Sequence, residues 1–119
     1  MSLPPPAPTN EDFRLVESAL TGERGEDQRR IATLGVIWLQ TLLAKHADYG
    51  GSVWKEPILL PGTEAGDAIL TRMSDKIERL RTLRTRPAEV VGETYGDTIG
   101  DLGSYCLLWL ARPRSPELT

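Results

Sequence analysis

Cysteine and histidine are almost absent from this sequence, which holds one of each, Cys106 and His46, in 119 residues. A single cysteine excludes a disulfide within the chain and a cysteine-rich zinc site. A single histidine excludes multi-histidine metal sites and argues against a Ser-His-Asp triad. Any divalent cation would therefore be held by carboxylates, which favours magnesium or manganese. The low cysteine content also fits a reducing cytoplasm, where we expect the protein.

Long apolar runs and an excess of positive charge are missing as well. The longest apolar stretch, residues 31–44, is interrupted by Gln40 and is shorter than the roughly 20 residues that a membrane span needs. The first residues, MSLPPPAPTN, lack the basic start of a secretory signal. The formal net charge of -3 creates no field that would draw the protein to duplex nucleic acid or to an anionic membrane. We therefore expect neither as a partner.

Apolar residues recur at intervals of three and four in four segments, and no segment alternates with a period of two. The pattern predicts a short helix that is N-capped by Asn10 and long helices over about 26–46, 67–83 and 93–111. We expect an all-α, four-helix bundle-like fold with a long loop between the second and third helices. Residues 1–9 form a proline-rich leader expected to be disordered, residues 10–112 one helical domain, and residues 113–119 a tail. Within the loop, the apolar residues 58–60 are predicted to pin it to the core.

Three acidic residues near the start of the last predicted helix, Glu93, Asp97 and Asp101, are spaced four residues apart and share one line along it. Like charges at this spacing destabilise a helix by a few tenths of a kcal/mol per pair, roughly, unless something compensates. A cation held by carboxylates is one compensation, and helical bundles build metal sites in this way. The alternative is a solvated face, because the acids lie nearly opposite the apolar side of the helix.

Glycines occupy the arc between these acids and the apolar side, and they favour close approach by a helix, a subunit or a ligand. They are Gly92, Gly96, Gly100 and Gly103.

The third predicted helix carries a basic stripe, Arg72, Lys76 and Arg79. Such side chains bind phosphates, with bidentate hydrogen bonds from arginine. Alternatively, the stripe pairs with acids of its own and neighbouring helices. In the loop, Tyr49 and Trp54 are candidates to stack on a base and Lys55 to reach a phosphate, although such aromatics also anchor loops to a core.

Three segments resemble one family: HADYGGSVWKEP (46–57), RMSDKIERL (72–80) and GETYGDTIGDLGSYCLL (92–108). They resemble the small phage and bacterial proteins of the nucleotide modification associated domain family, which look like relatives of the MazG-like all-α nucleoside triphosphate pyrophosphohydrolases. MazG-like enzymes use magnesium, held by Glu-x-x-Glu and Glu-x-x-Asp on successive helices, to let water attack the phosphate chain and release pyrophosphate. The motif positions fall on the following residues: Asp48, Tyr49, Asp75, Lys76, Glu93, Asp97 and Asp101.

The spacing departs from the MazG-like scheme, because this chain has Asp75-x-x-Glu78 and Glu93-x-x-x-Asp97. A nucleotide-binding relative without catalysis would carry the same residues.

Taken together, these features predict a magnesium-dependent (or manganese-dependent) nucleotide pyrophosphohydrolase that forms a homo-oligomer, a dimer or a tetramer. Glu93, Asp97 and Asp101 would hold the metal with Asp75 as a further ligand, and Asp97 and Glu93 would be catalytic. The substrate would be bound by Tyr49, Trp54, Lys55, Arg72, Lys76 and Arg79. The alternative is a non-catalytic helical binding or assembly module in which the glycines mark a subunit contact and the charged stripes form salt bridges.

Overall fold

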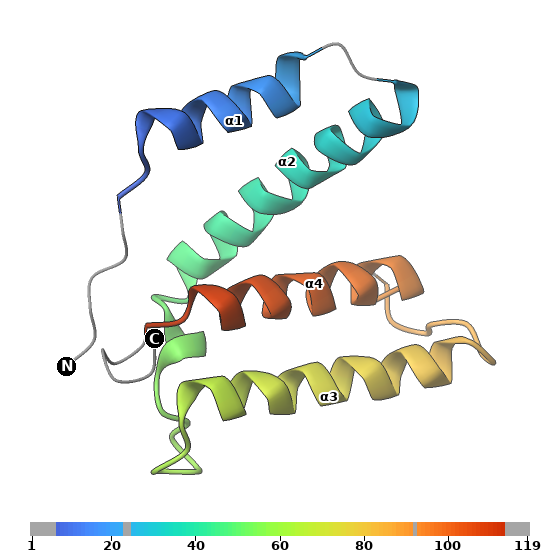
Figure 1. Ribbon diagram of the computed structural model, residues 1–119. Coiled ribbons are helices and arrows are strands. Elements are labelled where there is room, and N and C mark those ends of the chain that lie inside the picture. Colours follow the sequence, from blue (N-terminus) through green and yellow to red (C-terminus); the bar gives the residue numbers. More distant parts are fainter. Residues whose placement is uncertain (1–6, 23–24, 92, 114–119) are drawn as a thin grey trace.

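The computed structural model describes residues 7–22, 25–91 and 93–113, and over these ranges the chain is all-α, without strands (Figure 1). The elements are α1 (Asn10–Thr21), α2 (Glu26–Asp48), a 3-10 turn (Ser52–Trp54), α3 (Ala65–Leu83) and α4 (Tyr95–Ala111). The prediction of one short and three long helices is confirmed. Most of the predicted leader and tail, residues 1–6 and 114–119, lies outside the described residues.

Helices α1 and α4 begin with the same local device, a capping box of the form Thr-x-x-Asp. The Thr9 hydroxyl accepts a hydrogen bond from the Asp12 N–H, and the Asp12 carboxylate accepts one from the Thr9 N–H. Thr94 and Asp97 repeat this exchange at α4. Each box satisfies N–H groups that a helix start leaves unpaired. The N-cap of α1 is therefore Thr9 and not Asn10 as predicted.

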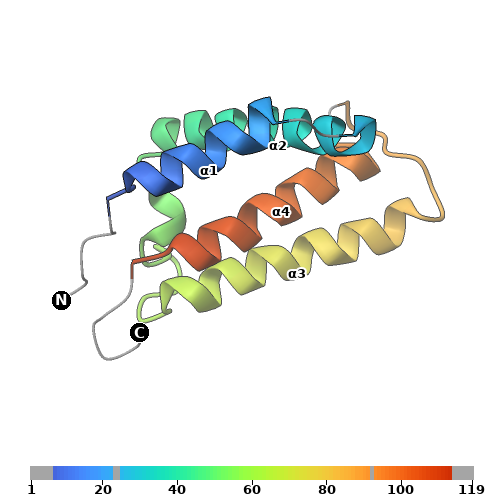
Figure 2. The same ribbon diagram turned by 45° about the horizontal axis from the view of Figure 1, so that its top comes forward.

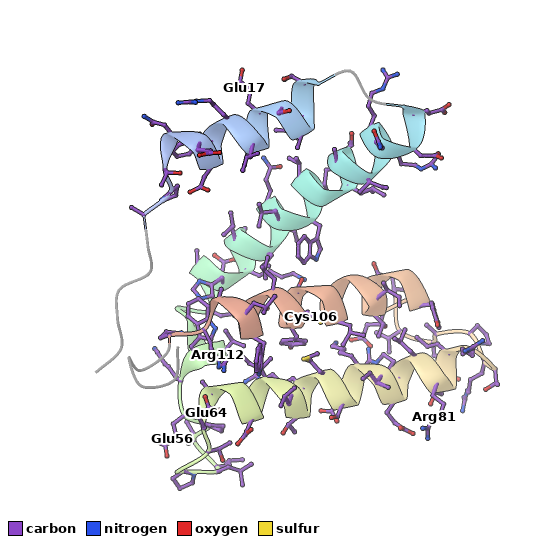
Figure 3. The ribbon with its side chains drawn as sticks, viewed as in Figure 1. Glu17, Glu56, Glu64, Arg81, Cys106 and Arg112 are labelled. Carbon is purple, nitrogen blue, oxygen red and sulfur yellow. The ribbon has the colours of Figure 1, made fainter. Side chains whose placement is uncertain are left out.

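Helices α3 and α4 form an antiparallel pair whose buried residues include Ile69 and Thr98 (Figure 1). The two helices approach each other closely where α3 begins and α4 ends. There a Cβ on Gly66 would lie 3.2 Å from the Trp109 indole nitrogen and 3.1 Å from Nε of Arg112. Arg112 also lies over the Trp109 ring and 3.8 Å from the carboxylate of Glu64, the N-cap of α3 (Figure 3). Glycine at position 66 thus permits the close approach of the two helix ends.

Helix α2 packs on α4 through Trp38. Its indole N–H donates to the Gly100 carbonyl at 3.1 Å and to the Ser104 hydroxyl at 3.0 Å. A Cβ on Gly103 would lie 3.8 Å from the same indole. Gly103 therefore faces a helix of the same chain, and Gly100 contacts that helix through its carbonyl. Helix α1 lies along α2 on the side away from α3 (Figures 1 and 2).

The loop between α2 and α3 is anchored by Trp54. Its indole N–H donates to the Leu108 carbonyl of α4 at 3.1 Å, and its ring packs on His46 with centroids 4.6 Å apart. Residues 58–60, in contrast, are exposed, with Ile58 95% accessible. The prediction that they pin the loop to the core is wrong, because the tryptophan provides both the apolar contact and the hydrogen bond.

None of the helices within the described ranges has the length and apolarity required to cross a membrane.

Candidate functional site

The three predicted acids line one hollow of about 440 Å³ between α2 and the start of α4. Asp97 and Asp101 lie on α4, whereas Glu93 precedes the N-cap Thr94 and is outside the helix. The prediction that the helix begins at Glu93 is wrong, because the Thr94–Asp97 capping box sets its start. We call the three residues the carboxylate line. The line borders the hollow, while Glu93 and Asp97 remain exposed to solvent, as the alternative of a solvated face expects.

The opposite wall of the hollow comes from α2 and contributes Trp38, Thr41, Leu42 and Lys45. Lys45 is the cation in this wall. The pKa of Asp97 is lowered mainly by the hydrogen bonds that it accepts from the Thr94 hydroxyl and the Thr94 backbone N–H, and to a smaller extent by the charge of Lys45. These interactions all favour the ionised carboxylate.

A second pocket of about 200 Å³ adjoins this hollow and shares four wall residues with it. The shared residues are Leu42, Lys45, Asp101 and Ser104. The second pocket adds Arg72 from α3, Tyr49 from the loop and Tyr105 from α4. We call the two connected spaces the α2–α4 cleft. It brings a cation of α3 and two aromatic side chains into the same pocket as Asp101, the last residue of the carboxylate line.

His46 also lines the cleft, and its Nε2 atom is buried without a hydrogen-bond partner among the described residues. Its ring is held by Trp54. His46 was not predicted as a site residue.

The basic stripe of α3 reaches the carboxylate line by ion pairs. Lys76 Nζ lies 3.1 Å from an Asp101 carboxylate oxygen, and Arg79 lies 2.7 Å from a Glu93 carboxylate oxygen. Both pairs are partly exposed. Two of the three members of the stripe therefore form ion pairs, one with an acid of α4 and one with the acid that precedes its N-cap, which is close to the salt-bridged alternative. Arg72, the third, lines the cleft instead.

The remaining predicted residues lie elsewhere. Lys55 and Asp75 are exposed and line none of the hollows described above. Trp54 anchors the loop rather than lining the cleft. Arg79 borders a separate, shallow hollow at the end of α3.

The donors present suit a hard divalent cation in type, since carboxylate oxygens are the ligands that magnesium prefers. Across residues 7–22, 25–91 and 93–113, however, no three His, Cys, Asp or Glu side chains gather closely enough to hold a metal ion. Two of the candidate ligands, Glu93 and Asp101, already pair with Arg79 and Lys76. To bind at the carboxylate line, a metal ion would have to displace these two side chains from the acids.

No family model matches this chain. Neither a curated protein nor a solved structure matches it.

Sequence reasoning missed Lys45 and Tyr105, although the spacing held a signal for each. Lys45 follows Leu42 by three residues and Trp38 by seven, which places it on the α2 face that meets α4. Tyr105 follows Asp101 by four residues on α4. Apolar periodicity identifies the face of a helix that packs, but it does not identify which polar residues at the ends of that face line a site.

Proposed function

We propose that this protein binds a nucleoside or deoxynucleoside triphosphate in the α2–α4 cleft and, with magnesium or manganese, hydrolyses it to a monophosphate and pyrophosphate. The observation that carries the proposal is the meeting of opposite charges in one cleft. Lys45 and Arg72 enter it from different elements, beside the carboxylate line. Phosphates need such cations, and a metal–phosphate complex also needs the acids.

The two cations of the cleft would bind the phosphate chain. Arg72 offers a planar guanidinium that can donate two parallel hydrogen bonds, while Lys45 supplies a compact charge from the opposite wall. Tyr49 and Tyr105 line the same pocket and offer aromatic surfaces for the base. The resemblance to nucleotide modification associated proteins makes modified deoxynucleotides candidate substrates as well. The cytoplasm, with its nucleotide pool, is the compartment that this activity requires.

The acids would have different roles, metal binding or proton acceptance, because their surroundings differ. Magnesium on the carboxylate line would supply positive charge against the phosphate oxygens. Asp97, with its lowered pKa, stays ionised and suits the role of a ligand more than that of a base. Glu93 has a partly exposed ion pair with Arg79 and, once separated from it, is the acid we assign to accept the proton of the attacking water.

The test is pyrophosphate release from a panel of ribo- and deoxynucleoside triphosphates with magnesium, manganese or EDTA. We expect metal-dependent release from the wild type and a loss of at least about a hundredfold in Asp97→Asn. Asp12→Asn is the matched control, because Asp12 occupies the same position in the α1 capping box but lies outside the cleft. It should keep wild-type activity. Equal activity in all three proteins, or no release from any substrate by folded protein, would refute the proposal.

A second candidate function, a non-catalytic nucleotide-binding or assembly module, is favoured by the partners that the acids already have. Glu93 pairs with Arg79, Asp101 with Lys76, and Asp97 with the cap of α4. Salt-bridged acids would make thermal stability depend on ionic strength, whereas a metal site would make it depend on magnesium. Melting curves at constant ionic strength, with magnesium or sodium as the cation, separate the two.

A further inference from the structure

Helix α2 is apolar on nearly all sides along residues 31–44, a stretch without a single charged residue. A helix of this kind is normally buried. In this chain, however, Leu42 is its only buried residue. Ile31 is 70% exposed and Leu34 is 61% exposed. The described chain therefore covers only part of the apolar surface of α2.

The uncovered part of α2 continues the face that already packs. Ile31 and Leu34 precede Trp38 by seven and four residues, so they share its side of the helix. Trp38 is covered by α4, but the amino-terminal half of α2 diverges from α4 (Figure 1). The apolar face thus runs on beyond the helix that covers it.

The apolar residues of α1 are also poorly buried. None of its residues is buried, and Phe13, Val16 and Leu20 form an apolar stripe along it, with Phe13 61% exposed. A helix of 12 residues is marginal by itself in water, so its stability depends on packing of this stripe.

We propose that the apolar surface formed by Phe13, Val16 and Leu20 of α1 and by Ile31 and Leu34 of α2 is covered by the same surface of a second copy of the chain. Two α1–α2 pairs then complete a four-helix arrangement around one apolar core. The contact is isologous, with each copy giving and receiving the same helices.

The exposed area supports a partner of this size. The accessible surface is 9573 Å², whereas a folded monomer of 13.2 kDa has roughly 6,400 Å². The fifteen residues outside the described ranges account for at most about 2,400 Å² of the difference, at the roughly 160 Å² per residue of an unfolded chain. At least about 700 Å² of excess remains, close to the about 800 Å² that each partner buries in a stable interface.

Charge argues against a lipid surface as the partner. The first turns of α1 and α2 are both acidic, with Glu11 and Asp12 in α1 and Glu26 and Asp27 in α2. In a chain of net charge -3, these acidic helix ends would be repelled by an anionic membrane.

Sedimentation velocity tests the proposal on the full chain. We expect the wild type to form a dimer, or a tetramer built from it, at micromolar concentration. Ile31→Glu should raise the dissociation constant by roughly a hundredfold or more, because each interface would bury two unpaired carboxylates. Ile58→Glu is the matched control: Ile58 is more exposed but lies in the loop, and its substitution should leave the assembly unchanged.

A second readout needs no substitution. Dimerisation through helices that are poorly covered in one chain makes the melting temperature rise with protein concentration. A wild type that sediments as a monomer with full helix content, or equal dissociation in Ile31→Glu and Ile58→Glu, would overturn the proposal, as would a concentration-independent melting temperature. The surface contains no cleft residue, so these results are independent of the nucleotide assay.

Discussion

Lys76 and Asp101 join α3 to the acidic wall of the cleft, with the ammonium nitrogen 3.1 Å from a carboxylate oxygen. Only 22% of the lysine side chain is exposed, so the pair is partly shielded from solvent. Through this ion pair, the basic stripe of α3 interacts directly with the carboxylate line. A ligand of either sign that enters the cleft has to compete with this pair.

Replacing Lys76 with methionine should therefore change both the stability of the metal-free protein and its response to magnesium. The stability of the metal-free protein should fall by about 0.5–1 kcal/mol, since a partly exposed ion pair contributes little more than that. The rise in melting temperature on adding magnesium should become larger than in the wild type, because Asp101 no longer has a competing cation. Thermal denaturation with and without magnesium measures both effects.

Lys55→Met is the control for this substitution, because Lys55 is exposed and lines neither part of the cleft. It should leave both values at the wild-type level. If Lys76→Met gains no magnesium response, the metal does not bind at Asp101.

The stability contributed by Asp97 should depend on pH in the acid range. Hydrogen bonds from Thr94 lower the pKa of Asp97 below its ordinary value of 3.8. A lowered folded-state pKa contributes stability that is complete above the unfolded value and is lost as the pH falls through the folded value. Urea midpoints between about pH 2 and 6 should thus show a difference between the wild type and Asp97→Asn that shrinks toward low pH.

Asp12→Asn should behave in the same way, because the pKa of Asp12 is lowered by the corresponding bonds with Thr9. A difference between wild type and variant that grows as the pH falls would contradict this account of the caps.

Two glycines allow a direct test of close packing. A Cβ at Gly66 would lie 2.9 Å from a Glu64 carboxylate oxygen and 3.2 Å from the Trp109 indole nitrogen, so Gly66→Ala should destabilise the protein by about 1–3 kcal/mol. Gly100 has open space at its Cβ position, and Gly100→Ala should stabilise α4 by about 0.5–1 kcal/mol. Equilibrium denaturation of the two variants measures this opposition. Equal effects of the same sign would show that the helix ends near Gly66 are not closely packed.

The sequence by itself determined the helices. Apolar spacing and capping residues act through neighbours three or four positions away, so the all-α fold and its four helices could be predicted without tertiary information. The first residue of a helix could be predicted less precisely where two capping residues are adjacent, as at Thr9 and Asn10, because either side chain can accept a hydrogen bond from the first turn. The carboxylate line and the basic stripe of α3 were likewise visible in the sequence, whereas Lys45 was not predicted as a site residue.

Only the tertiary structure decided which stripes meet. The crossing of α2 over α4 brought Lys45 to Asp97, and the pairing of α3 with α4 joined Lys76 to Asp101. Trp54, and not the more apolar residues 58–60, became the loop anchor, because it alone combines a ring against His46 with a donor for the Leu108 carbonyl. Such choices depend on contacts between residues more than 50 positions apart in several cases. Local periodicity carries no information about them, since every amphipathic helix offers a face and packing alone selects what it faces.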